Sequence, residues 1–193
     1  MPEAVIVAAT RSPIGRARKG SLKDVRPDDL AAQTIRAALD QVPELDRSEI
    51  DDLMVGCGQP AGESGYNLAR VVSVLAGLPE VPATTVNRYC SSSLQTTRMA
   101  LHAIRAGEGD VFVSAGVESV SRSLETGRAD GLPGTRNPVF DEALARTERR
   151  AQGAAEPWQD PAVHGSLPDV YISMGQTAEN VAQRTGISRQ EQD

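Results

Sequence analysis

Residues 83–93 read Ala83-Thr84-Thr85-Val86-Asn87-Arg88-Tyr89-Cys90-Ser91-Ser92-Ser93. The first four residues are rich in β-branched side chains, which favours a strand. A helix is expected from about Ser91 to Ala106, and Gly107 stands where a helix end favours glycine. The stretch therefore predicts a strand, a short turn, a cysteine and a helix, with Cys90 opening the helix.

Cys90 is the residue of this stretch with the chemistry of a nucleophile. A helix N-terminus presents unsatisfied N–H groups and partial positive charge, which favour the reactive thiolate. The three serines after Cys90 are small enough to leave room for an acyl group. The backbone N–H of Cys90 is a candidate donor for half of an oxyanion hole. The alternative is an inert buried cysteine, because free cysteine is among the most buried residue types.

The segments around this stretch alternate between strand and helix patterns. Further strands are expected at residues 5–9, 50–55 and 110–116, and helices from about 28 to 42 and from about 67 to 78. Strands that alternate with crossover helices indicate a mostly parallel sheet covered on both faces. The expected fold class is α/β.

The composition changes after about Ser121. Residues 130–134 and 156–161 are loop-like, and one short charged helix is expected between them at 142–150. A last amphipathic helix is expected at about 175–185, and Ser188 has the character of a helix N-cap. We therefore expect an α/β domain at residues 1–120 and a loop-rich lobe at residues 121–193.

The bulk composition narrows the function classes. The 193 residues carry a formal charge of −6, which argues against nonspecific binding to nucleic acid or to an anionic membrane. No apolar stretch reaches the roughly 18 residues of a membrane span, and residues 1–10 lack a secretory pattern. Two cysteines in such a chain indicate reduced thiols in the cytosol. A Cys57–Cys90 disulfide is the less favoured alternative.

Residues 87–95 resemble the acyl-enzyme cysteine motif of the thiolase family, which reads Asn, two variable residues, Cys, a small residue, Ser and another small residue. Three further segments are similar to that family in order and approximate spacing: Ile6-Val7-Ala8-Ala9-Thr10-Arg11-Ser12-Pro13-Ile14-Gly15, Ala115-Gly116-Val117-Glu118-Ser119-Val120-Ser121-Arg122, and Met174-Gly175-Gln176-Thr177-Ala178-Glu179-Asn180-Val181-Ala182. The resemblance implies a thiolase-like layered fold of which this chain holds the incomplete first half and part of the loop domain.

The resemblance also implies a chemistry. Cys90 corresponds to the nucleophile that carries an acyl group during ping-pong cleavage or formation of 3-ketoacyl-CoA. Ser173 and Met174 correspond to residues that line the pantetheine and acyl pocket. Ser173 stands where short-chain enzymes commonly have histidine, which favours a different or longer acyl chain. Ser93 replaces the family's usual glycine and either narrows the site or adds a hydrogen bond. Coenzyme A is expected as a substrate, with no resident cofactor and no metal.

Other parts of the family's catalytic apparatus are missing from these residues. The activating histidine, a second cysteine and a water-holding asparagine belong to the family's second half, so the chain alone is expected to be inactive. His102 lies about 18 Å along the helix from Cys90. His164 is expected to be a surface histidine of the loop lobe.

Three readings of the function remain open at this point. The first is a cytoplasmic thiolase of fatty acid metabolism that uses acyl-CoA and CoA and forms a homodimer or homotetramer in its full-length form. The second is a related condensing synthase of the same fold. The third is a non-catalytic fragment or subunit that needs a C-terminal partner half. We expect the isolated chain to aggregate or assemble, because a sheet edge and an apolar face would be exposed.

Other signals have simpler interpretations. The run from Gly56 to Ala61 matches a dinucleotide-binding pattern, but Pro60 and Gly62 interrupt the expected helix, so a plain loop is favoured. Cys57 is expected in the core. A basic cluster in the first loop is expected to be solvated, with a CoA phosphate contact as the alternative: Arg11, Arg16, Arg18 and Lys19. Trp158 either packs the lobe or contacts CoA.

Overall fold

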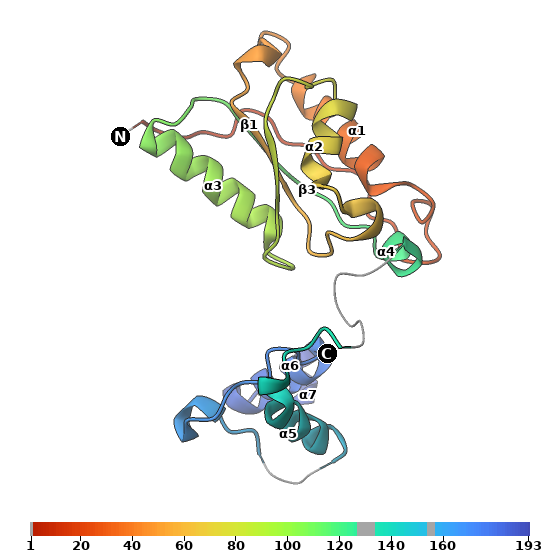
Figure 1. Cartoon of the computed structure of the whole chain (residues 1–193), viewed down its shortest axis with the longest axis vertical. Helices are drawn as coiled ribbons and strands as arrows, with labels where there is room; N and C mark the ends of the chain where they lie inside the picture. Colours follow the sequence, from red (N-terminus) through yellow and green to blue (C-terminus); the bar gives the residue numbers. More distant parts are fainter. Residues whose placement is uncertain (1, 127–133, 154–156) are drawn as a thin grey trace. The chain divides into compact units, whose positions relative to one another are not determined.

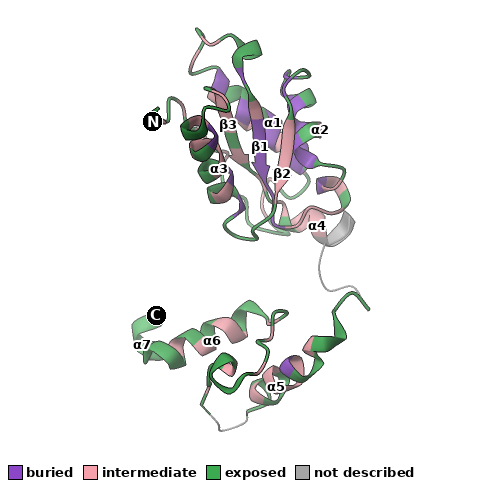
Figure 2. Cartoon of the chain, turned by 60° about the vertical axis from the view of Figure 1, so that its left-hand side comes forward, coloured by how far each residue is buried: buried purple, intermediate pink, exposed green. Residues whose placement is uncertain are grey.

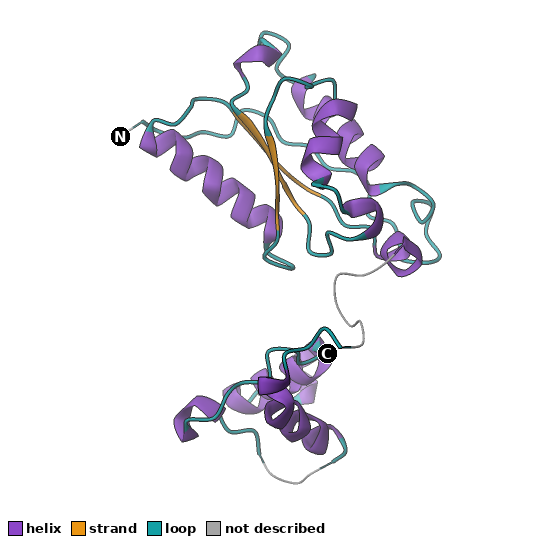
Figure 3. Cartoon of the chain, viewed as in Figure 1, coloured by secondary structure: helices purple, strands orange, loops and turns teal. Residues whose placement is uncertain are grey.

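The computed structural model describes residues 2–126, 134–153 and 157–193. The chain divides into two compact units, residues 1–130 and 131–193, and each is described by itself. The first unit holds the sheet and the helices packed on it (Figure 1). The second unit is helical in the residues that the structure describes (Figure 3).

A three-stranded parallel sheet forms the centre of the first unit. Strand β1 (Asp52–Gly56) lies between β2 (Ala83–Val86) and β3 (Phe112–Gly116). Leu53 of β1 is paired with Ala83 on one side and with Val113 on the other. The predicted α/β fold with a parallel sheet is confirmed, and these three strands lie where the sequence pattern places them.

Helices cover both faces of the sheet. Helices α1 (Pro27–Leu39) and α2 (Leu68–Leu75) lie on one face, and α3 (Ser92–Ala106) lies on the other (Figure 1). The core between the sheet and the first two helices is fully buried at Leu53, Val55, Leu68 and Val72 (Figure 2). Gly107 ends α3 in the left-handed conformation that its position predicts.

The strand predicted at residues 5–9 is absent, and this expectation was wrong. Val5, Ile6 and Val7 are 69%, 80% and 74% exposed, and the segment is irregular. Directly after this segment, the Thr10 hydroxyl donates a 3.0 Å hydrogen bond to the carbonyl of Thr34 in α1. A strand needs a neighbour that satisfies its backbone groups. In the described part of the chain the sheet has three strands, and none of them pairs with residues 5–9.

Shorter elements complete the first unit. The 3₁₀ turns η1 (Arg47–Glu49) and η2 (Gly62–Ser64) precede β1 and α2. Helix α4 (Val120–Thr126), which the sequence pattern did not predict, follows β3. The Arg122 guanidinium of α4 makes a two-pronged ion pair with the Glu63 carboxylate of η2. Arg26 adds a second cation to Glu63 at 2.8 Å. This network fastens α4 to the first unit.

The second unit consists of short helices joined by loops. Helix α5 (Asp141–Ala151) follows the turn η3 (Pro138–Phe140), and η4 (Pro161–His164) precedes α6 (Met174–Thr185) and α7 (Arg189–Gln192). Ser188 caps α7 with a reciprocal capping box, as its sequence predicts. The predicted loop at 130–134 lies almost entirely outside the described residues. Among the described residues, no helix is both long and apolar enough to span a bilayer.

Candidate active site

Cys90 lies in the turn between β2 and α3, at the carboxyl edge of the parallel sheet, and it is exposed. Ligands of open α/β sheets bind outside this edge. Helix α3 begins at Ser92 with Ser91 as its N-cap, so Cys90 precedes the helix and does not open it as expected. The difference arises because residues 88–91 form a turn of their own.

Side chains on both sides of Cys90 fix this turn. Asn87 Oδ1 accepts a 2.8 Å hydrogen bond from the backbone N–H of Tyr89. The Ser92 hydroxyl accepts a 2.9 Å bond from the N–H of Arg88 and donates a 2.6 Å bond to the carbonyl of Tyr89. Tyr89 has a left-handed φ of 46°, which costs free energy in any residue with a Cβ. The thiol is therefore carried by a strained and strongly bonded turn.

The roles of Asn87 and Ser92 were not predicted. Asn87 stands in the sequence as a motif residue, and Ser92 as a small residue that leaves room for an acyl group, and neither property predicts a hydrogen bond. The signal was available, because asparagine commonly bonds the backbone N–H two residues later in a turn. The Asn-x-x-Cys spacing places that bond directly before the thiol.

Two glycines let the start of α3 rest on the strand ends. A Cβ on Gly56 would lie 2.5 Å from the backbone of Ser92 and Ser93, and one on Gly116 would lie 2.6 Å from Ser93 Cβ. Neither contact is sterically possible for another residue without movement of the backbone. The Ser93 side chain thus lies against Gly116 at the end of β3. The close approach places the Cys90 turn at the sheet edge.

Cys57 differs from Cys90 in its access to solvent. Its side chain is buried, as expected for a core residue, and both cysteines are free thiols. Burial, with a smaller contribution from the Glu118 carboxylate, raises the pKa of Cys57 to about 11. The Cys57 Sγ lies 3.8 Å from Glu118 Oε1. The structure therefore presents Cys90, and not Cys57, to reagents in solution.

The other predicted site residues belong to the second unit or lie away from the turn. Ser173 is the N-cap of α6, and Met174 begins that helix with 68% of its surface exposed. Both residues belong to the second unit, whereas Cys90 belongs to the first. His164 Nε2 lies 3.0 Å from Gln159 Oε1 in the second unit, and His102 is an exposed residue of α3.

The structure also describes the glycine-rich run, the basic first loop and Trp158. The glycine-rich run after β1 leads into η2, and α2 starts only at Leu68, so the plain loop is confirmed. Within the basic first loop, the backbone N–H of Arg18 donates to the Ser121 hydroxyl at 2.8 Å, and its side chain is exposed. The Trp158 N–H donates to Gln183 Oε1 at 2.8 Å, which ties the backbone of this residue to α6.

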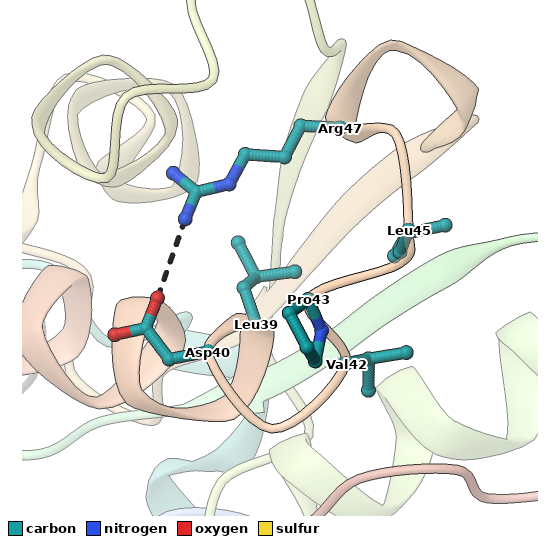
Figure 4. Close-up of a pocket in the computed structure, with 6 residues that line it drawn as sticks. All are labelled: Leu39, Asp40, Val42, Pro43, Leu45 and Arg47. Atoms are coloured by element: carbon teal, nitrogen blue, oxygen red, sulfur yellow. Dashed lines mark hydrogen bonds and ion pairs between the residues drawn. The ribbon is translucent and has the colours of Figure 1, made fainter.

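A hollow of about 250 Å³ lies where α1 leads into β1 (Figure 4). Its lining includes Leu39, Pro43 and Leu45, and an ion pair of 3.4 Å between Arg47 and Asp40 stands at its rim. It adjoins the segment that precedes β1, whereas Cys90 follows the carboxyl end of β2. This hollow is therefore not part of the cysteine site.

The family model of the thiolase N-terminal domain matches residues 4–193 of this chain. The chain belongs to the thiolase family. It is 41% identical over 194 residues to a 3-ketoacyl-CoA thiolase of Bacillus subtilis and 41% identical over 197 residues to a β-ketoadipyl-CoA thiolase of Acinetobacter baylyi. A 3-ketoacyl-CoA thiolase of Aeromonas hydrophila is 36% identical.

This thiolase chain is covered completely in each of these alignments, but it spans only 42–45% of the length of the relatives. The turn that carries Cys90 and the glycine-supported start of α3 lie within the matched region.

Proposed function

We propose that the protein carrying this chain is a thiolase-type acyl-CoA acyltransferase that cleaves or forms 3-ketoacyl-CoA, with Cys90 as the nucleophile. The observation that carries the proposal is an exposed thiol in a strained, bonded turn at the carboxyl edge of a thiolase N-terminal domain. The relatives named as 3-ketoacyl-CoA thiolases support this substrate class.

In the degradative direction, the Cys90 thiolate attacks the keto carbon of 3-ketoacyl-CoA. The bond between that carbon and the α-carbon of the CoA thioester breaks, and its electron pair stays on the α-carbon. The α-carbon takes up a proton, which balances the one that the Cys90 thiol lost, and acetyl-CoA leaves. The acyl group stays on Cys90 as a thioester. The thiolate of a second CoA then attacks the thioester, releases the Cys90 thiolate and departs as acyl-CoA. A thiolate is both a nucleophile and a leaving group, so each step is reversible.

The remaining roles are proposals that depend on the first. Ser173 and Met174 line the pantetheine and acyl pocket, and Ser173 favours an acyl chain that is different from or longer than that of acetoacetyl-CoA. The backbone N–H of Cys90 serves as one oxyanion donor. CoA is a substrate, and no resident cofactor takes part. Residues 1–120 act as the thiolase α/β domain and residues 121–193 as part of its loop domain.

The assembled protein is proposed to be a cytoplasmic homodimer or homotetramer that acts in fatty acid metabolism. Strands β2 and β3 are the two edges of the sheet among the described residues, and a free edge favours pairing with another chain. Sedimentation of the full-length protein measures this assembly. A monomer at working concentrations would contradict it.

A second candidate function follows from the fraction of its relatives' length that the chain spans. Because it spans less than half of their length, the 193 residues alone are proposed to hold the nucleophile without the full catalytic apparatus. A related condensing synthase or a non-catalytic subunit would use the same residues. The intact mass of the purified natural protein separates a subunit from a complete enzyme: 20.5 kDa supports a separate subunit, and a larger mass supports a complete enzyme. The residues of the second half would separate a thiolase from a condensing synthase.

The test of catalysis is CoA-dependent cleavage of 3-ketoacyl-CoA by the full-length protein. Cys90→Ala should reduce kcat to background, and Cys57→Ala should leave kcat largely intact. Activity that survives Cys90→Ala would overturn the proposal. Chains of increasing acyl length, compared by kcat/KM, test the assignment of Ser173.

A further inference from the structure

The segments that follow the three strands converge at the carboxyl edge of the sheet. The N–H of Val117, after β3, donates to the carbonyl of Gly56 at 3.0 Å, and the N–H of Cys57, after β1, donates to the carbonyl of Val86 at 3.0 Å. These bonds continue the ladder by one residue beyond the strands. They place the segment after β1 between the segment that holds Glu118 and the segment that holds Cys90.

Glu118 spans this edge with both oxygens of its carboxylate. Oε2 accepts a 2.7 Å hydrogen bond from the N–H of Gly58, and Oε1 lies 3.8 Å from the Cys57 thiol. A short bond from a backbone N–H to a carboxylate is charge-assisted and stronger than a neutral one. Glu118 therefore fixes the position of Gly58.

Gly58 in turn lies against the backbone of Tyr89. A Cβ on Gly58 would be 3.0 Å from Glu118 Oε2 and 3.4 Å from both the Cα and the carbonyl carbon of Tyr89. The carboxylate and the Tyr89 backbone thus face the same side of Gly58. The carbonyl carbon of Tyr89 is bonded to the nitrogen of Cys90, so Glu118 and Gly58 adjoin the peptide that carries the nucleophile.

Tyr89 needs such support because its φ is 46°. A residue with this backbone persists only where its surroundings hold it. Asn87 and Ser92 bond it from within the turn. Gly58, held by Glu118, adjoins it from the neighbouring segment.

We propose that Glu118 is a positioning residue for the Cys90 turn, holding Gly58 against the Tyr89–Cys90 peptide by the length and hydrogen bonding of its side chain. This role rests on the proposed function of Cys90 but does not involve contact with substrate. The contribution of Glu118 is geometric, so an uncharged acceptor of equal length can replace it. A carboxylate that is shorter by one methylene cannot bond Gly58 from the same backbone position.

The test compares Glu118→Gln, Glu118→Asp and the exposed control Glu44→Gln in the full-length protein. Hydrogen exchange of the peptide at residues 87–92 reports the order of the turn, and thiolysis kinetics report the reaction. Glu118→Asp should speed exchange about tenfold and lower kcat about 30-fold with little change in KM. Glu118→Gln should stay within about threefold of the unmodified protein in both measurements.

Two results would overturn the proposal. Exchange and kcat that are unchanged in Glu118→Asp would show that the turn does not depend on Glu118. A Glu118→Gln variant as impaired as Glu118→Asp would show that the charge, and not the length, matters. If the unmodified protein shows no thiolysis, that result refutes the proposed function but not the role of Glu118. The exchange measurement still reports whether Glu118 orders the turn.

Discussion

A Cβ atom placed on Gly56 would lie 2.5 Å from the backbone nitrogen of Ser93, so the first turn of α3 rests directly on the end of the central strand. Gly116 gives the same close approach at the end of β3. The turn that carries Cys90 immediately precedes this part of the helix. The position of Cys90 therefore depends on two residues without side chains at the ends of neighbouring strands.

Gly56→Ala should destabilise the protein by about 3 kcal/mol, because the added methyl group meets backbone atoms that cannot rotate away. Denaturant unfolding measures this loss. Gly175→Ala is the matched control, since nothing lies within 4 Å of a Cβ at that position. It should be neutral or slightly stabilising. A Gly56→Ala variant as stable as the control would contradict the close packing of α3 on β1.

Ser92→Ala should lower the stability of the protein by about 1–3 kcal/mol and slow acylation of Cys90, because it removes the bonds to Arg88 and Tyr89 at a buried position. Thermal unfolding and single-turnover acylation measure the two effects. Ser91→Ala removes one exposed hydroxyl bond and should cost less in both measurements. Equal effects of the two variants would refute the special role of Ser92.

Iodoacetamide at pH 8 should modify Cys90 and leave Cys57 intact. Burial, aided by the Glu118 carboxylate, raises the pKa of Cys57 to about 11, so about one molecule in a thousand has this thiolate at pH 8. Cys90 is exposed. Peptide mass spectrometry locates the modification, and unfolding in denaturant should make both thiols reactive. Comparable labelling of both cysteines in the folded protein would be inconsistent with the structure.

Glu63→Gln should reduce the dependence of the protein's stability on pH in the acid range. Its hydrogen bonds from Arg122 lower the pKa of Glu63 in the folded state, so the stabilisation is present above the unfolded value of about 4.3 and is lost as the pH falls through the folded value. The variant should lose about 1–2 kcal/mol at pH 7 and show a shallower fall in Tm below about pH 5. Glu44→Gln, at an exposed position, is the control. An unchanged acid profile in Glu63→Gln would argue against the ion pair.

The strands and most helices follow from local sequence patterns. The apolar runs at β1, β2 and β3 predict strands because each is short and bounded by turn residues. Gly107 and Ser188 predict a helix end and a helix start because their conformations and caps are local. Residues 5–9 have an equally good strand pattern, yet they are irregular. Local composition cannot say whether a strand finds a partner.

The candidate site is predictable only in part for a related reason. The motif around Cys90 indicates the nucleophile, and the small residues after it indicate access. The roles of Glu118 and Gly58 depend on contacts between segments that lie 60 residues apart. The start of α3 after Cys90 depends on the bonds of Ser92 to residues before it. No periodicity in the sequence reports such contacts.

The central claim is that Cys90 carries the acyl group. Its most direct measurement is peptide mass spectrometry of the full-length protein after brief incubation with 3-ketoacyl-CoA and acid quenching. We expect an acyl adduct on the Cys90 peptide that disappears on adding CoA and is absent from Cys90→Ala. An unmodified Cys90 peptide, or an adduct on Cys57 in its place, would contradict the account.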